Sequence, residues 1–446
     1  MHQGNMSLNF WFGILSATYI AKITMKRVKL MDGYAIGLVC DKCQKDYDIR
    51  RAVNTCPACG GLLETVYDLP RMKKEISFAK LWANGNTLWR YKDFFPAIDE
   101  KNIVSLGEGC TPLVKSVHLS RELGMENIYF KNDTMMPTGS FKDRGFSLAI
   151  SFAKDIGVKK GFTYSSGNAG ASFAAYSSRG GFNALVLVEY LASDTKKAMI
   201  KLYGAPTAIL NFENFAQISV MLEKAVRQLG LYQFVNFINP IRHEAMKTYA
   251  YEIFDQLGGA VPDYMFHPVG TGGGLWGAWK GYNELKALGL TDQLPKMVAV
   301  QPETSCHLKK AFQKGARVAG QYGDPAKTIA QSIAADSPIQ GGTRVLDAIY
   351  QSGGLALGVT DPEILAAMRI LGKEGIGAEP SSAAAVAALM QGVKNGTVNP
   401  NATAVCVITG TALKQSRAVE MAAGQPELRV NADIDSLAEL IDSLPI

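Results

Sequence analysis

Residues 137–145, Pro137-Thr138-Gly139-Ser140-Phe141-Lys142-Asp143-Arg144-Gly145, place one lysine among small, turn-forming and hydroxyl-bearing residues. A mostly apolar run over 146–152 follows and is typical of a helix. This order predicts that Lys142 lies at a junction between a loop and a helix, where a helix N-terminus favours an uncharged amine. Such an amine can attack a carbonyl and form a Schiff base. A surface lysine in a turn is the plainer interpretation.

A second stretch, Gly270-Thr271-Gly272-Gly273-Gly274, follows an apolar strand over 264–269 and precedes a helix over 275–286. Backbone N–H groups of this glycine loop (270–274) can converge on a phosphate at the helix N-terminus. Residues 272–277 also read G-x-G-x-x-G, the dinucleotide-binding pattern, and Glu303 ends the next strand-like run. A tight turn between strand and helix is a third interpretation.

The lysine stretch is one of five blocks whose order and spacing resemble the threonine synthase family of fold-type II pyridoxal-phosphate (PLP) enzymes. The resemblance extends from about Cys40 to about Lys414. The other blocks are Gly107-Glu108-Gly109-Cys110-Thr111-Pro112-Leu113, the loop 165–172, Asn239-Pro240-Ile241-Arg242 with Lys247-Thr248, and the strand 405–410. The resemblance implies an α/β fold similar to the tryptophan synthase beta subunit. In that fold, two three-layer α/β domains enclose a cleft, and here a small N-terminal zinc ribbon precedes them.

The resemblance also implies a role for each matching residue. Lys142 would hold PLP and be the catalytic residue, and Asn168 would bond the ring hydroxyl of PLP. The cofactor-binding residues implied are Phe141, Asn168, Gly270, Thr271, Gly272, Gly273, Gly274 and Thr409. The substrate-binding residues implied are Ser165, Ser166, Gly167, Ala169, Arg242 and Lys247.

Strands and helices alternate through most of the chain, with strands expected over 127–130, 161–164, 183–188 and 206–210. This alternation favours parallel sheets covered by helices. A stretch with helical spacing lies over 433–444. The domains expected are an N-terminal extension (1–35), a ribbon-like unit (36–66), a large PLP-binding domain (67–144 and 236–425), a smaller α/β domain (145–235) and a tail (426–446).

Four cysteines in the ribbon (36–66) have the spacing of a zinc site: Cys40 and Cys43, then twelve residues, then Cys56 and Cys59. Each Cys-x-x-Cys turn offers two thiolates to one tetrahedral ion. A structural zinc is therefore expected, because four thiolates leave no open position for catalysis. A relic ribbon that folds without metal is the alternative.

The composition narrows the class of protein. A 446-residue chain with 47% hydrophobic and 19% charged residues is typical of a globular enzyme of two or three domains. Its charge of +6 is spread along the chain, which argues against nucleic-acid binding. No apolar run is long enough for a membrane span, and seven cysteines suit a reducing cytoplasm. The apolar run 10–21 fits a weak signal peptide or, as we prefer, a start assigned upstream of Met25 or Met31.

The resemblance implies a homodimer that converts O-phosphohomoserine and water into L-threonine and phosphate. Candidate cations for the substrate phosphate are Lys131, Arg144, Arg242 and Lys247. The chain departs from the family at Ala169, where a hydroxyl residue is usual, and at Met136, where asparagine is usual. A β-eliminating or β-replacing enzyme acting on serine, threonine or a related amino acid is therefore the alternative, and a catalytically silent PLP-binding regulator is a third hypothesis.

Overall fold

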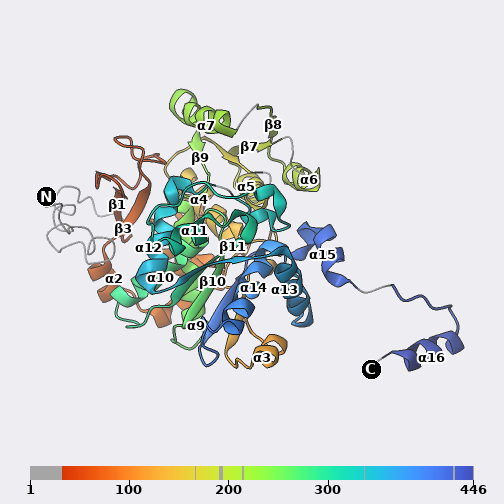
Figure 1. Cartoon of the computed structure of the whole chain (residues 1–446). Helices are drawn as coiled ribbons and strands as arrows, with labels where there is room; N and C mark the ends of the chain where they lie inside the picture. Colours follow the sequence, from red (N-terminus) through yellow and green to blue (C-terminus); the bar gives the residue numbers. More distant parts are fainter. Residues whose placement is uncertain are drawn as a thin grey trace.

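The computed structural model describes residues 33–165, 167–189, 194–212, 215–335, 337–424 and 427–444. The apolar run 10–21 and the two alternative start methionines lie outside these residues. Three sheets organise the described chain (Figure 1). None of the helices in the described part is long and apolar enough to cross a membrane.

The largest sheet has six strands in the order β12-β11-β10-β13-β5-β4. All neighbours are parallel except β4, which runs antiparallel to β5. The bounds are β4 Leu113–Lys115, β5 Ile128–Asn132, β10 Tyr264–Pro268, β11 Lys296–Pro302, β12 Leu355–Val359 and β13 Ala404–Ile408. Strand β13, the last in sequence, lies in the middle of the sheet, between β10 and β5.

The two faces of this sheet are buried against different helices. Val405 and Val407 of β13 belong to one apolar core, whereas Cys406 and Ile408 belong to another. Alternate residues of a strand point to opposite faces, so both faces are covered. Helices α10 (Gly273–Ala287) and α12 (Thr343–Ser352) lie on one side, and α13 (Asp361–Lys373) and α14 (Pro380–Lys394) lie on the other (Figure 1).

A second, parallel sheet has the order β8-β7-β6-β9, built from β6 Lys160–Tyr164, β7 Asn183–Glu189, β8 Thr207–Leu210 and β9 Tyr232–Gln233. The strands expected near 127, 161, 183 and 206 are confirmed as β5 to β8. A small antiparallel sheet, β2-β1-β3, forms the ribbon from β1 Ala35–Cys40, β2 Asp46–Tyr47 and β3 Leu63–Tyr67. The exact domain boundaries stay a prediction.

The remaining helices connect and cover these sheets. They are α2 Leu69–Glu75, α3 His118–Leu123, α4 Lys142–Asp155, α5 Asn168–Arg179, α6 Asp194–Leu202, α7 Phe215–Leu229, α8 Pro240–Glu244, α9 Thr248–Gln256, α11 His307–Gln313, α15 Ser416–Ala423 and α16 Ile434–Ser443. The helix expected over 433–444 is confirmed as α16, which lies away from the body of the molecule (Figure 1).

Candidate active site

Lys142 is the first residue of α4, so the predicted junction between loop and helix is confirmed. Two contacts fix the loop that leads to it. The backbone N–H of Phe141 donates to the carbonyl of Thr409, which follows β13, at 2.9 Å. The carboxylate of Asp143 accepts hydrogen bonds from the backbone N–H of Thr138 at 2.7 Å and from the hydroxyl of Ser172 on α5 at 2.5 Å. The lysine is thus held between the end of β13 in the six-stranded sheet and α5, the helix that follows β6 of the second sheet.

The surroundings of Lys142 favour its uncharged form. Burial, and after it the positive charge of Arg242, lower the pKa of Lys142 to about 7, while the carboxylate of Glu379 acts in the opposite direction. Its Nζ lies 4.1 Å from the ring centroid of Phe141. At neutral pH a substantial fraction of the side chain is therefore a free amine that can attack a carbonyl or accept a proton.

The glycine loop lies beside this lysine. A Cβ on Gly274 would lie 3.3 Å from the ring of Phe141, the residue that precedes Lys142. Gly272 has φ +94°, and a Cβ there would lie 2.2 Å from Val345 on α12. A Cβ on Gly273 would lie 2.7 Å from Asn236, whose amide donates to the hydroxyl of Thr271. The backbone therefore needs glycine at position 272 and leaves little room for a side chain at 273 and 274. The loop leads directly into α10, whose first-turn N–H groups have no partner within the helix.

Asn168 begins α5 and is held by two charged side chains. Its amide donates to Glu379 at 2.9 Å, and its carbonyl oxygen accepts from Lys414 at 2.9 Å. Sequence reasoning missed Glu379, which is only 2% exposed and lies directly before α14. Its local signal is a carboxylate before a proline and an alanine-rich run, which equally fits an ordinary helix start.

Thr409 is buried at the end of β13, and its hydroxyl lies 2.9 Å from that of Ser382 in the first turn of α14. In the substrate loop, the backbone N–H of Gly167 donates to the hydroxyl of Ser165 at 3.3 Å. Ala169 follows Asn168 in the first turn of α5. Ser166 lies outside the described residues. The structure therefore brings the described part of this loop to the start of the same helix as Asn168.

Arg242 on α8 is a buried cation with unused hydrogen-bonding capacity. Its Nη1 donates to the carbonyl of Phe234 at 2.7 Å, and its guanidinium carbon lies 4.0 Å from the ring centroid of Phe146. Its Nε and Nη2 are buried without a hydrogen-bond partner among the described residues. Burial lowers the pKa of Arg242 to about 9, which leaves it charged at neutral pH. A buried guanidinium with two unpaired nitrogens, close enough to lower the pKa of Lys142, is suited to bind an anion.

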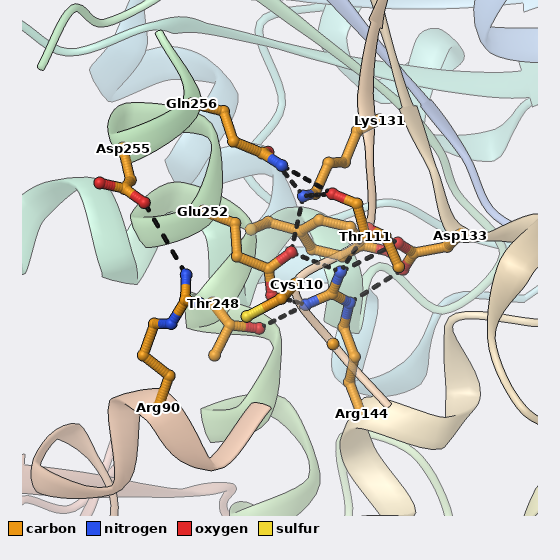
Figure 2. A network of polar contacts seen from close by, with 12 residues as sticks. Arg90, Cys110, Thr111, Lys131, Asp133, Arg144, Thr248, Glu252, Asp255 and Gln256 are labelled. Atoms are coloured by element: carbon orange, nitrogen blue, oxygen red, sulfur yellow. Dashed lines mark hydrogen bonds and ion pairs between the residues drawn. The ribbon is translucent and has the colours of Figure 1, made fainter. Parts of the chain in front are cut away.

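The other three candidate cations have no such capacity. Arg144 donates to Asp133 at 2.9 Å, to Thr248 at 2.7 Å and to Glu252, and Lys131 donates to Glu252 at 2.6 Å (Figure 2). Lys131 also donates to the carbonyl of Thr111 at 2.6 Å and to Gln256 at 2.8 Å. Motif residues Thr111, Arg144 and Thr248 thus meet in a buried network that stabilises the fold.

Lys247 lies in a different buried cluster. Its Nζ is 2.7 Å from the carbonyl of Phe94 and 3.0 Å from carboxylate oxygens of both Glu244 and Glu284. Lys247 therefore already has three acceptors within the fold, and its role toward the substrate stays a prediction.

The ribbon brings its four cysteines together as the spacing predicted. The sulfurs of Cys40 and Cys59 are 3.5 Å apart, as are those of Cys43 and Cys56, and all four lie within 4.8 Å of one another. Sulfurs bound to one tetrahedral zinc at the usual Zn–S distance of about 2.3 Å would be separated by roughly 3.8 Å. The donor set therefore fits zinc.

Comparison with known proteins identifies the family. The family described as pyridoxal-phosphate dependent enzyme matches residues 104–410. Threonine synthase of Methanocaldococcus jannaschii is 39% identical over 407 residues, which cover 91% of this chain and 99% of the relative. The chain belongs to the threonine synthase family of pyridoxal-phosphate-dependent enzymes. Threonine synthase of Methanosarcina acetivorans is 37% identical over 91% of this chain and 98% of its own length.

Solved structures of more distant enzymes share the fold of this family member. Maize serine racemase has a TM-score of 0.60 and 20% identity, covering 70% of this chain and 91% of its own. The processed form of threonine deaminase isoform 2 from Solanum lycopersicum has a TM-score of 0.59 and 21% identity, covering 76% of this chain and 94% of its own. The chain is thus a fold-type II α/β PLP enzyme, and the dinucleotide interpretation of residues 272–277 loses its support.

The residues present fit PLP. Lys142 offers an amine with a lowered pKa, and the glycine loop offers backbone donors at the start of α10 where side chains cannot be accommodated. Asn168 and Thr409 are connected to the two neighbours of Lys142. The backbone N–H of Phe141 donates to the carbonyl of Thr409, and the carboxylate of Asp143 accepts from Ser172 on α5, the helix that Asn168 begins. These elements would hold the cofactor between the two larger sheets.

Proposed function

We propose that this protein is a threonine synthase, which converts O-phosphohomoserine and water into L-threonine and phosphate. The observation that carries the proposal is the buried guanidinium of Arg242, with two unpaired nitrogens. O-phosphohomoserine carries a phosphate in addition to its carboxylate, and a buried guanidinium without partners for two of its nitrogens is suited to bind that further anion. The names of relatives 37–39% identical over most of the chain support the same reaction.

Each residue then has a task. Lys142 removes the proton from Cα of the substrate and, once it has given that proton up, a proton from Cβ, because its lowered pKa leaves the amine partly uncharged. Two protons return to Cα and Cγ, and water adds its hydroxyl at Cβ after phosphate has left from Cγ. The unpaired Nε and Nη2 of Arg242 hold the substrate phosphate and remain bonded to it as it leaves from Cγ. The first turn of α5 binds the substrate carboxylate through backbone N–H groups and Ser165. PLP, when bound through the glycine loop, Asn168 and Thr409, supplies an electron sink for negative charge at Cα.

One assay tests the reaction. Purified enzyme is offered O-phosphohomoserine, serine and threonine separately, and the release of phosphate and of keto acid is measured. We expect phosphate and threonine from O-phosphohomoserine. Keto acid and ammonia from serine or threonine, without phosphate release from O-phosphohomoserine, would replace this proposal with the β-eliminating enzyme that Ala169 suggests.

Arg242→Met tests the role of the guanidinium, because methionine keeps much of the apolar packing over Phe146. We expect kcat/KM for O-phosphohomoserine to fall by roughly 10- to 100-fold, the loss of one or two charge-assisted hydrogen bonds. The matched control is Arg317→Met, because the Arg317 side chain is 58% exposed and pairs with Asp347 at 2.9 Å. Equal kcat/KM in wild type and Arg242→Met would contradict the proposed phosphate site.

The ribbon completes the proposal with one structural zinc per chain, held by Cys40, Cys43, Cys56 and Cys59. Support comes from the four sulfurs within 4.8 Å of one another. The homodimer and the cytoplasmic location stay predictions.

A further inference from the structure

One carboxylate of the ribbon has polar contacts with three helices outside the ribbon, α8, α10 and α12. Glu64 lies on β3, and its side chain is 15% exposed. Its Oε1 accepts from Lys280 at 2.5 Å, and its Oε2 accepts from Trp276 at 3.1 Å. The same Oε2 lies 3.0 Å from Nη1 of Arg344 and 3.3 Å from Nε2 of His243.

Each of these helices contributes to one of two proposed anion sites, the substrate-phosphate site at Arg242 or the PLP-phosphate site at the glycine loop. His243 is the neighbour of Arg242 on α8. Trp276 and Lys280 lie on α10, the helix that the glycine loop begins. Arg344 on α12 precedes Val345, whose side chain limits the space at Gly272. A single ribbon carboxylate therefore lies 3.3 Å from His243, the residue after the proposed phosphate ligand. It also accepts hydrogen bonds from α10 and pairs with Arg344, the neighbour of Val345.

Helices α8 and α10 pack too closely for one to move without displacing the other. A Cβ on Gly277 of α10 would lie 2.6 Å from the carbonyl of His243 and 2.3 Å from Met246. Displacing α8 relative to α10 would therefore move Arg242 with it. Asp41, between Cys40 and Cys43, adds a second ribbon contact, because its Oδ2 lies 3.4 Å from Nε of Arg344.

The carboxylates of this cluster pair with cationic side chains and leave no place for a metal ion. Glu64, His243 and Glu244 place three potential ligand atoms within 4.8 Å of one another. Lys280, however, donates to both Glu64 and Glu244 at 2.5 Å, so its ammonium already occupies the position of an ion. Burial alone would raise the pKa of Glu64, but Lys280 and Arg344 hold it well below its usual range. The carboxylate is thus charged at neutral pH.

We propose that Glu64 is a positioning residue for substrate phosphate: through His243, Lys280 and Arg344 it sets the placement of α8, and with it Arg242, against the glycine loop. The ribbon is then part of the substrate-recognition machinery as well as a structural appendage. This inference rests on the proposed function, because it takes Arg242 as the phosphate ligand.

Glu64→Gln tests the inference, since glutamine keeps the shape of the side chain and removes its charge. We expect KM for O-phosphohomoserine and the inhibition constant for inorganic phosphate each to rise about tenfold, with kcat within about twofold. The zinc content should stay at the wild-type value. The matched control is Asp347→Asn, which breaks an ion pair on the same helix α12 and should leave both constants unchanged.

Asp41→Asn provides a milder variant if Glu64→Gln does not fold, and it should shift both constants in the same direction by a smaller factor. A Glu64→Gln protein with a lower melting temperature but unchanged KM and phosphate inhibition would overturn the inference and leave Glu64 a role in stability alone. Arg242→Met separates the two levels. If it leaves phosphate inhibition unchanged, the proposed phosphate ligand fails; if it weakens inhibition while Glu64→Gln does not, only the positioning role fails.

Discussion

At the scale of the residue, burial and, after it, two opposing charges set the pKa of Lys142. Arg242 disfavours the ammonium form, and the carboxylate of Glu379 favours it. Glu379 also accepts from the amide of Asn168. The pKa of the amine is therefore shifted by the same arginine that would bind the substrate phosphate and by the same glutamate that accepts from Asn168, the residue proposed to bind PLP.

This arrangement predicts how the capture of PLP depends on pH. Only the uncharged amine reacts, so the rate for cofactor-free enzyme should rise with pH and reach half its plateau near the pKa of Lys142, about 7. Arg242→Met removes a nearby positive charge and should move the midpoint to higher pH; Glu379→Gln should move it to lower pH. Stopped-flow absorbance under identical conditions measures the pH midpoints of wild type and variants. The ionisation of free PLP affects all of them equally, so it cancels when the midpoints are compared. A wild-type midpoint above about pH 9 would contradict the environment described for Lys142.

The unpaired guanidinium also predicts a cost in stability. Arg242 is 1% exposed, and two of its nitrogens lack partners among the described residues. Without ligand, the free energy of unfolding of Arg242→Met should therefore be about 1–2 kcal/mol higher than that of wild type, and its denaturation midpoint should be higher. The same variant should lose activity on O-phosphohomoserine. Chemical denaturation of the cofactor-free proteins measures the difference. A less stable methionine variant would mean that the charge has compensation within the fold.

The sequence motifs could not separate the four candidate cations. Lys131, Arg144, Arg242 and Lys247 all lie near family-like blocks, yet three of them are saturated by acceptors that come from other segments. Those acceptors, such as Glu252 and Glu284, are brought in by the packing of α9 and α10 and have no local signature. Glu379 was missed for the same reason. Lys142, in contrast, was predicted correctly at a helix start because the turn residues before it and the apolar run after it are local.

At the scale of the element, the glycine loop shows how a backbone shape excludes side chains. Gly272 combines a left-handed φ of +94° with a neighbour, Val345, that would lie 2.2 Å from a Cβ. The alternation of strands and helices was sufficient to predict most of these elements. The order of the strands was not predictable in this way, because pairing β13 with β5 and β10 joins segments that lie far apart in the chain.

Gly272→Ala should weaken PLP binding more than it weakens the fold. The left-handed φ costs roughly 1–2 kcal/mol by itself, and the clash with Val345 displaces the loop from the cofactor phosphate. Gly353→Ala is the matched control, because Gly353 has φ +61° and no described atom within 4 Å of its Cβ position. Equilibrium binding of PLP and thermal unfolding are measured for both. Equal loss of PLP affinity in the two variants would show that the phosphate lies elsewhere.

At the scale of the whole molecule, the ribbon is fastened to the catalytic body by buried charge. Loss of zinc should therefore lower the stability of the whole protein and not of the ribbon alone. We expect one zinc per chain, and Cys40→Ser should lose it and lower the melting temperature by at least ~2 °C. Cys110→Ser, outside the cysteine cluster, should do neither. Protein purified without chelator that contains no zinc would make the ribbon a relic.

The central position of β13 has a consequence for synthesis on the ribosome. Lys142 and its loop emerge early, but the carbonyl of Thr409 that fixes Phe141 directly follows the last strand to be made. Until then the nascent chain holds two unfilled strand edges, on β5 and on β10, with apolar residues on both faces. Such edges are templates for wrong pairing between chains. Growing chains of this enzyme are thus exposed to aggregation until β13 has been made, and chaperones that bind the nascent chain at that stage should matter most for its yield.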